Sequence, residues 1–258
     1  MLDLPRRVAC FLLGVGLLWA AVARGSWLLG AGSALAFAAF GWIWWRARER
    51  ARRRAAWAQR APQRPEEKQL YEMVWQHPAY RSSSPGEQAV ETFLRVAQPE
   101  AGAEVVDLGC GSGRGSMRLA SAGGLRVTMV DFARNCLNPS VQSALEADPS
   151  PLRFVVADLT EALPVSAAYG FCCDVLEHIP PDKVDAVLEN CLRAARRVFF
   201  QICTVEDAFG KVVGFPLHLT VQPYEWWLTQ FRERGCAIHW SENEGVNARF
   251  YVSAAHPS

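Results

Sequence analysis

The strongest constraint on the fold is an alternation of short strand-forming runs with helical segments that begins at residue 104. The runs are rich in β-branched and aromatic residues, and they are bounded by turn-forming residues. Five of them come in succession: Glu104–Leu108, Arg126–Asp131, Arg153–Asp158, Gly170–Asp174 and Arg197–Cys203. Such alternation favours parallel strands joined by right-handed crossovers. We therefore expect an α/β fold with a doubly wound, mostly parallel sheet that has helices on both faces.

The segments between and beyond these runs have helical patterns. Helices are predicted over Ser116–Ser121, Asn135–Glu146, Pro181–Ala195 and Pro223–Arg234. Two final strand-forming runs, Ala237–Ser241 and Ala248–Ser253, have no helix between them. They predict an antiparallel hairpin at the end of the sheet.

Two further helices are expected to precede the sheet. Pro62–Pro65 is typical of a linker, and Glu66–Trp75 after it has a helical pattern. In the next helix Ser84 suits the N-cap, Pro85 suits the first helical position, and Glu87 completes a capping box before a run to Val96.

The first strand-forming run leads directly into a turn that contains Gly109, Gly111 and Gly113. Glycines without Cβ atoms let the backbone turn sharply and approach a ligand at the carboxyl end of the strand. The dinucleotide fingerprint G-x-G-x-x-G is absent, because Arg114 and Ser116 occupy the two possible places of its third glycine. No Gly-Lys-Ser/Thr follows, so a phosphate loop is excluded as well. A nicotinamide-dependent oxidoreductase is therefore disfavoured.

The turn, DLGCGSG over residues 107–113, resembles the D-x-G-x-G-x-G motif of the class I S-adenosylmethionine-dependent methyltransferases. Three further matches follow in order: Asp131 ends the second run, Asp158 ends the third, and FCCDVLEHIP over residues 171–180 resembles the V-L-E-H-I segment of small-molecule and quinone-type members. The resemblance covers about residues 104–253. Each match alone is weak, but their order and their positions at strand ends make the set specific.

The resemblance implies S-adenosylmethionine as the cofactor, with Asp131 accepting from the ribose hydroxyls and Asp158 from the adenine amino group. The full set of cofactor-binding residues that it implies is Asp107, Gly109, Cys110, Gly111, Gly113, Asp131, Phe132, Asp158, Leu159 and Asp174. The alternative interpretation makes Asp131 and Asp158 turn residues at strand ends, which is common for a single aspartate.

Three residues are candidates for acid–base chemistry at a hydroxyl acceptor. His178 follows the fourth strand and is the best placed base, and Glu177 could orient it. The alternative is that Glu177 caps a helix and that His178 lines the cofactor pocket without titrating. His218, in the long connection after the fifth strand, is a second candidate base, although a single histidine in a loop is more often structural.

Residues 1–45 predict a transmembrane helical hairpin. Val8–Ala23 and Trp27–Trp45 contain no charged residue, and only Arg24, Gly25 and Ser26 separate them. The flanks are basic, so the positive-inside rule predicts both termini in the cytoplasm. We therefore expect a two-pass protein of the inner or cytoplasmic membrane. In the rival interpretation the first span is a signal peptide cleaved after Ala23, and the Arg-rich end of the second span would still place the large domain inside.

Charge divides the chain into the same parts. Residues 1–64 hold eleven arginines against Asp3 and Glu49, a balance of +9, and because the whole chain carries +1 the rest carries −8. We expect residues 46–64 to be an Arg-rich juxtamembrane segment and linker that contacts an anionic lipid surface, and residues 65–258 to be the methyltransferase domain. The acidic charge of that domain argues against nucleic acid as a partner.

The eight cysteines include no C-x-x-C pair and no Cys/His spacing typical of zinc, so reduced thiols and no metal site are expected. Together these features predict a membrane-anchored S-adenosylmethionine-dependent methyltransferase. Its acceptor is expected to be a small molecule, lipid-linked, glycan or otherwise close to the membrane, and oxygen the methylated atom. The rival is a catalytically inactive membrane scaffold with a methyltransferase-like binding domain.

Overall fold

The computed structural model describes residues 41, 48, 65–82 and 84–254. Contacts divide the chain into two units, residues 1–62 and 63–258, and the second is described below. Apart from Gly41 and Arg48, the predicted membrane hairpin and the Arg-rich segment lie outside the described residues. Among the residues that are described, no helix is both long and apolar enough to cross a bilayer.

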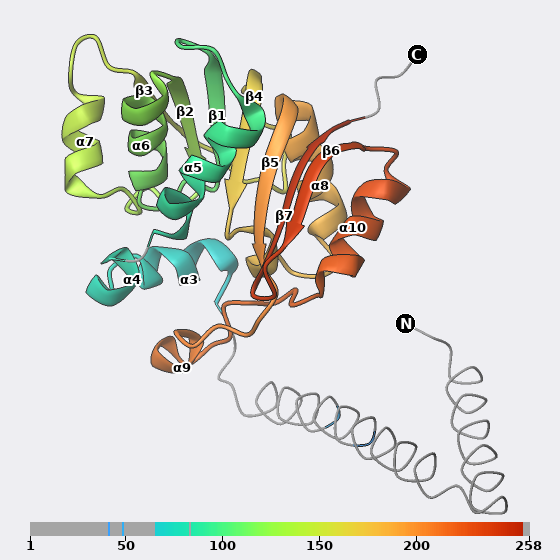
Figure 1. Cartoon of the computed structure of the whole chain (residues 1–258). Helices are drawn as coiled ribbons and strands as arrows, with labels where there is room; N and C mark the ends of the chain where they lie inside the picture. The colour runs from blue at the N-terminus through green and yellow to red at the C-terminus, as the bar shows by residue number, and fades with distance from the viewer. Residues whose placement is uncertain (1–40, 42–47, 49–64, 83, 255–258) are drawn as a thin grey trace, which may run out of the picture. The chain divides into compact units, whose positions relative to one another are not determined.

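The second unit is built on one seven-stranded sheet with the strand order β3-β2-β1-β4-β5-β7-β6 (Figure 1). The strands are β1 (Glu104–Leu108), β2 (Arg126–Asp131), β3 (Leu152–Val156), β4 (Ala167–Cys173), β5 (Ala195–Cys203), β6 (Ala237–Asn243) and β7 (Asn247–Ser253). The first five strands are parallel, and β7 pairs antiparallel with both β5 and β6. The predicted sheet and its antiparallel end are confirmed.

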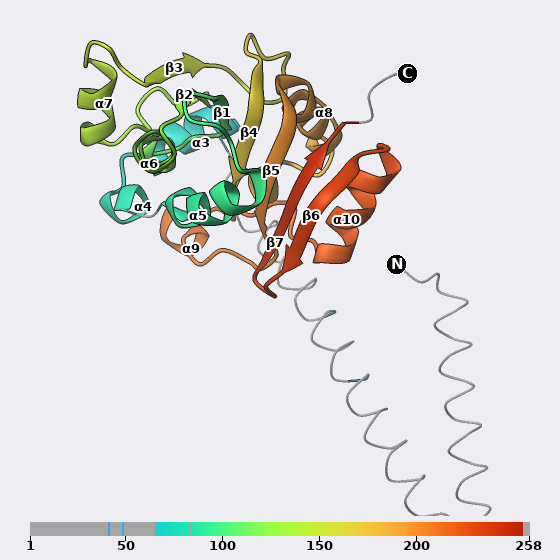
Figure 2. The ribbon, with the colours of Figure 1, turned by 45° about the horizontal axis from the view of Figure 1, so that its top comes forward.

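Helices cover both faces of the sheet, as Figure 2 shows from a second angle. One face packs against α5 (Pro85–Ala97), α6 (Arg114–Gly123) and α7 (Pro139–Leu145), and the other against α8 (Val184–Ala194) and α10 (Tyr224–Glu233). The strand period of two explains the division, because Val105 of β1 belongs to the first core and Val106 to the second. The sheet is therefore buried on both sides, as parallel sheets are.

Three short helices gather near the carboxyl ends of the parallel strands: α3 (Glu67–Val74), α4 (Pro78–Ser82) and α9 (Gly210–Val213). Leu70 and Val74 of α3 are buried with Leu217 in a small third core, against which Phe209 packs. This core joins the start of the domain to the connection between β5 and α10, and it places α3 beside the glycine turn.

Two local predictions are wrong in detail. The capping box does not form. The side chain of Ser84 makes no hydrogen bond to the N-terminal amides of α5, and Glu87 instead forms an ion pair with Arg114 at 2.5 Å. The predicted helix from Asn135 begins only at α7, where the side chain of Asn138 accepts from the Ser140 amide. At α5, a contact with another part of the chain replaces the expected local bond. At α7, a cap further along the sequence sets the start of the helix.

We expect Phe93→Ala in α5 to lower the free energy of unfolding by about 3–5 kcal/mol, because it empties a fully buried site. The Phe93 ring lies 5.5 Å from that of Phe171 and 6.0 Å from that of Phe199, so the cavity would open between helix and sheet. Equilibrium denaturation measures the change. Met73→Ala, at a side chain that is 50% exposed, is the control and should change stability by less than about 0.5 kcal/mol.

Candidate active site

The glycine turn is closed against the neighbouring strand by backbone hydrogen bonds. The amides of Gly109 and Cys110 both donate to the carbonyl of Val130, at 2.9 and 3.0 Å. Gly109 and Gly111 have φ of 78° and 50°, a region that side chains disfavour. A Cβ at Gly109 would lie 2.5 Å from Val175, and one at Gly111 would lie 2.9 Å from the Trp75 ring. Backbone conformation and close packing therefore both require glycine here.

Asp131, at the carboxyl end of β2, is bonded to this turn. One carboxylate oxygen accepts from the Gly111 amide at 3.0 Å and the other accepts from the Ala133 amide at 2.9 Å. The side chain is 7% exposed, and burial raises the pKa of Asp131 to about 6 although the amide bonds oppose the shift. Each oxygen keeps a further lone pair, so the carboxylate can still accept from a ligand.

Asp107, at the end of β1, is more deeply enclosed. It accepts from the Ser116 hydroxyl at 2.5 Å, and burial raises the pKa of Asp107 to about 7. This bond ties the strand end to the first turn of α6. Gly113 is the N-cap residue of that helix, with φ of 74°.

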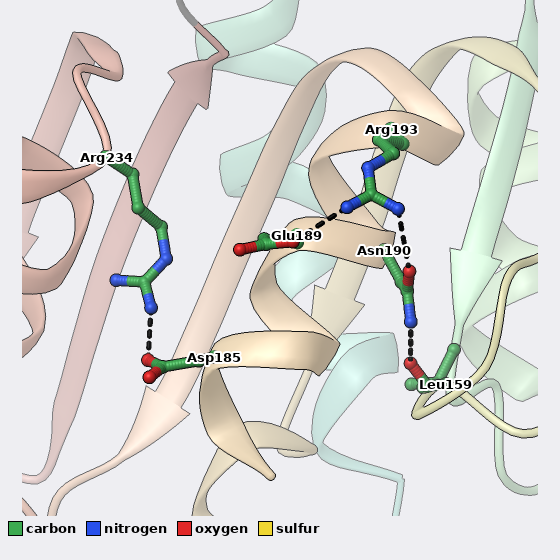
Figure 3. A network of polar contacts seen from close by, with 6 residues as sticks. All are labelled: Leu159, Asp185, Glu189, Asn190, Arg193 and Arg234. Atoms are coloured by element: carbon green, nitrogen blue, oxygen red, sulfur yellow. Dashed lines mark hydrogen bonds and ion pairs between the residues drawn. The ribbon is translucent and has the colours of Figure 1, made fainter.

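Asp158 lies just after β3 and is exposed at the edge of the site. One of its oxygens accepts from both the amide and the hydroxyl of Thr160, each at 2.8 Å, so it also stabilises its own turn. The next residue, Leu159, is buried, and its carbonyl accepts from the Asn190 side chain of α8 at 2.9 Å (Figure 3). Asp158 can therefore stabilise its turn and still face a ligand, so the two interpretations of this residue do not exclude each other.

Two adjoining cavities open at this edge of the sheet. The first, of about 120 Å³, is lined by Asp131, Phe132, Asp158 and Leu159. The second, of about 370 Å³, extends past Asp107, Cys110 and Ser112 to Asp207 and His218. Six residues line both cavities: Trp75, Tyr80, Gly109, Gly111, Asp174 and His178. The site is therefore one elongated space with the glycine turn at its middle.

The end of β4 contributes a group of titratable side chains. Asp174, with φ of 55°, accepts from Gln201 at 2.8 Å. Glu177, in the short 3₁₀ helix η1 (Leu176–His178), is fully buried, and one of its oxygens accepts from the Cys203 amide at 3.0 Å. Burial, followed by the charge of Asp174, raises the pKa of Glu177 well above its usual range.

His178 and His218 come together although forty residues separate them in the sequence. Their ring centroids are 4.7 Å apart. The Nδ1 atom of His178 lies 2.7 Å from the Tyr71 hydroxyl and 3.0 Å from the Leu217 carbonyl, and Nδ1 of His218 lies 2.7 Å from the Val205 carbonyl. The two candidate bases are thus one pair, held by backbone carbonyls.

The comparisons with known proteins agree with this geometry. Residues 105–197 match the family model of a methyltransferase domain. The fold is that of the class I methyltransferases. Curated proteins give no match.

Solved structures supply the fold comparison. A magnesium protoporphyrin IX methyltransferase from Synechocystis, crystallised with S-adenosylmethionine, is 17% identical with a TM-score of 0.57, over 75% of this chain and 100% of that one. A phosphoethanolamine N-methyltransferase of Haemonchus contortus in complex with S-adenosylmethionine is 24% identical, with a TM-score of 0.51 over 62% of this chain and 40% of that one. An O-methyltransferase family protein of Burkholderia thailandensis is 14% identical, with a TM-score of 0.51 over 71% and 62%. These neighbours support the prediction of S-adenosylmethionine as cofactor.

The structure brings most of the predicted site residues to the two cavities. The exceptions are Gly113 and Glu177, which lie behind the cavity walls in the described part of the chain. The aromatic residues at the start of the domain were not predicted: Tyr71 of α3, Trp75 at the C-cap of α3 and Tyr80 of α4 line the cavities. Leu70, Tyr71 and Val74 are buried on one face of α3, a spacing that is typical of a covered helix face but does not identify the surface that it covers.

We expect Gly111→Ala to destabilise the protein more than Gly124→Ala. Both glycines have positive φ, 50° and 61°, so both variants carry a backbone penalty of about 1 kcal/mol. Only the Cβ at residue 111 would press on the buried Trp75 ring, since the nearest atom to a Cβ at residue 124 lies at 3.8 Å. Denaturation of both variants measures the difference, and in a Trp75→Ala background the excess at Gly111 should disappear. Equal penalties in the original background would contradict the packing argument.

Proposed function

We propose that the protein is a membrane-anchored S-adenosylmethionine-dependent methyltransferase that methylates a hydroxyl oxygen of a small acceptor close to the membrane. The observation that carries this proposal is the continuous space that runs from Asp131, past the glycine turn, to the His178–His218 pair. At one end, Asp131 can accept hydrogen bonds from a nucleoside. At the other end, the His178–His218 pair lies where the acceptor hydroxyl must lose its proton.

The first cavity suits the adenosine part of the cofactor. Asp131 can accept from two vicinal ribose hydroxyls while it keeps its bonds to the Gly111 and Ala133 amides. Asp158 stands further along the same wall, within the turn that Asn190 holds, where it could accept from an exocyclic amino group. Phe132 and Leu159 supply apolar surface for the base.

The cofactor, when bound, supplies both the methyl electrophile and the leaving group. The protein must position the acceptor oxygen behind the methyl carbon and exclude water. Trp75 and Tyr80 wall the junction of the two cavities, and burial raises the pKa of the Tyr80 hydroxyl, so it stays protonated. The acceptor hydroxyl must lose its proton in the second cavity, where the His178–His218 pair lies.

Sequence order supports a membrane-proximal acceptor. The Arg-rich segment ends at Arg64, three residues before α3 begins, and α3 with its C-cap residue supplies Tyr71 and Trp75 of the cavity wall. An anchor at residues 1–45 with an Arg-rich flank on an anionic surface would keep this wall near the bilayer. We propose accordingly a cytoplasmic catalytic domain on a two-pass membrane protein and a lipid-linked, glycan or similar acceptor.

We expect Asp131→Ala to weaken binding of S-adenosylhomocysteine by at least tenfold, because two charge-assisted hydrogen bonds to the ribose are lost. Calorimetry measures the affinity. The control is Glu104→Ala, which removes an exposed carboxylate from the opposite end of the neighbouring strand and should leave the affinity unchanged.

The affinity for S-adenosylhomocysteine should depend on pH. Because burial raises the pKa of Asp131 to about 6, the carboxylate is present above that pH and is lost as the pH falls through it. Affinity should therefore be constant above pH 7 and about tenfold weaker at pH 5, and Asp131→Asn should abolish this dependence. A protein that binds no S-adenosylhomocysteine at any pH would favour the inactive scaffold instead.

We expect the purified full-length protein to transfer tritium from methyl-labelled S-adenosylmethionine into an extract of membrane lipids and lipid-linked glycans. The label should be stable to conditions that cleave methyl esters, since an ether forms at a hydroxyl. Transfer should be lost in Asp131→Ala and kept in Glu104→Ala. Binding of the cofactor product without any transfer would contradict catalysis on this class of acceptor while leaving the cofactor site intact.

A further inference from the structure

Three side chains with metal-binding atoms converge at the acceptor end of the site. Glu177 and His178 come from η1 at the end of β4, and His218 comes from the connection between α9 and α10. One ligand atom from each lies within 4.8 Å of those of the other two, close enough to share one ion.

The carboxylate of Glu177 forms no ion pair within the described ranges of the chain. The side chain is 0% exposed, and while one oxygen accepts from the Cys203 amide, the other has no hydrogen-bond partner among the described residues. A buried carboxylate oxygen without a partner is costly, and it is uncommon in folded proteins. The carboxyl group of Asp174 lies close to Glu177, and both its charge and a side-chain contact with it raise the pKa of Glu177, so the anion of Glu177 is disfavoured unless a cation is bound.

The two histidines are oriented as metal ligands usually are. Each has Nδ1 beside a backbone carbonyl, Leu217 for His178 and Val205 for His218. A carbonyl only accepts, so a neutral ring that donates to it has its proton on Nδ1 and its lone pair on Nε2. Nδ1 of His178 also lies 2.7 Å from the Tyr71 hydroxyl, and we infer the tautomer in which Nδ1 donates. Carbonyl groups that fix the tautomer in this way are the common second layer of protein metal sites.

We propose that Glu177, His178 and His218 bind one divalent transition-metal ion of the zinc or manganese class. One carboxylate and two imidazoles form a donor set that suits Zn²⁺, Mn²⁺ or Fe²⁺ better than Mg²⁺ or Ca²⁺, which prefer oxygen alone. Three protein ligands leave coordination positions open. His178 and His218 both line the second cavity, so the open positions face the space for the acceptor.

The ion gives a defined route for the proton of the acceptor, and this step rests on the proposed methyltransferase function. A hydroxyl that coordinates the ion becomes more acidic and releases its proton to water. The resulting oxygen donates an electron pair to the methyl carbon, a C–O bond forms, and the C–S bond breaks with its electron pair moving to sulfur. The histidines then act by holding the ion, and no side chain has to accept the proton of the acceptor.

Metal binding is tested on the purified full chain after treatment with a chelator and dialysis. Titration with Zn²⁺ or Mn²⁺ alone should show one equivalent bound, and Mg²⁺ should bind at least a hundredfold more weakly. Co²⁺ used as a spectroscopic probe should give visible absorption bands of a site with nitrogen and oxygen ligands. Glu177→Gln and His218→Ala should each weaken Zn²⁺ binding at least tenfold and remove the Co²⁺ bands. His239→Ala, at an exposed histidine of β6, is the matched control and should change neither.

Circular dichroism and S-adenosylhomocysteine affinity establish that the variants are folded. His218→Ala removes a partly exposed loop side chain, so it tests the site even where Glu177→Gln does not fold. Unchanged Zn²⁺ stoichiometry and Co²⁺ spectrum in His218→Ala would overturn the proposal, as would full methyl transfer by the metal-free protein. Zn²⁺ bound by these three residues without methyl transfer to any hydroxyl acceptor would support the metal site and contradict the proposed function.

Discussion

The carboxylate of Asp131 joins the two features on which the site depends. It ends β2, yet it holds the Gly111 amide of the turn that follows β1, and the Gly109 and Cys110 amides in turn bond to Val130 beside it. These bonds hold the glycine turn in left-handed backbone conformations that it would otherwise populate only part of the time. They also leave the carboxylate buried with lone pairs toward the cavity. One side chain thus both shapes the binding loop and faces the ligand.

Acidic groups that are difficult to ionise are concentrated at this edge of the sheet. Burial raises the pKa of Asp107, Asp131, Asp174 and Glu177. Desolvation disfavours their anions, and a positive ligand would relieve that cost. The sulfonium of the proposed cofactor and the cation proposed at Glu177 are both of that sign. The electrostatics of this edge of the sheet therefore favour cationic ligands.

The parts of the site that could be predicted are those formed by residues that are consecutive in the sequence. The run from Glu104 to Leu108 and the run from Arg126 to Asp131 were predicted with the bounds that β1 and β2 have, because alternation and glycine are local signals. The wall formed by Tyr71, Trp75 and Tyr80 was missed. An apolar helix face shows that something is covered, but the covered surface belongs to another part of the chain.

The amino-acid sequence by itself determined the sheet, the order of its parallel strands along the chain, the glycine turn and the acids at the strand ends. These follow from side-chain period, backbone freedom and the rule that parallel strands need crossovers. Only the tertiary structure decided that His218 meets His178 and that Glu177 is buried with one oxygen that has no hydrogen-bond partner in the part of the chain that the structure describes. The sequence spacing predicted no metal site, because a ligand set assembled from η1 and a loop forty residues later has no characteristic spacing. Such a cluster exists only once the crossover has returned the chain to the same edge of the sheet.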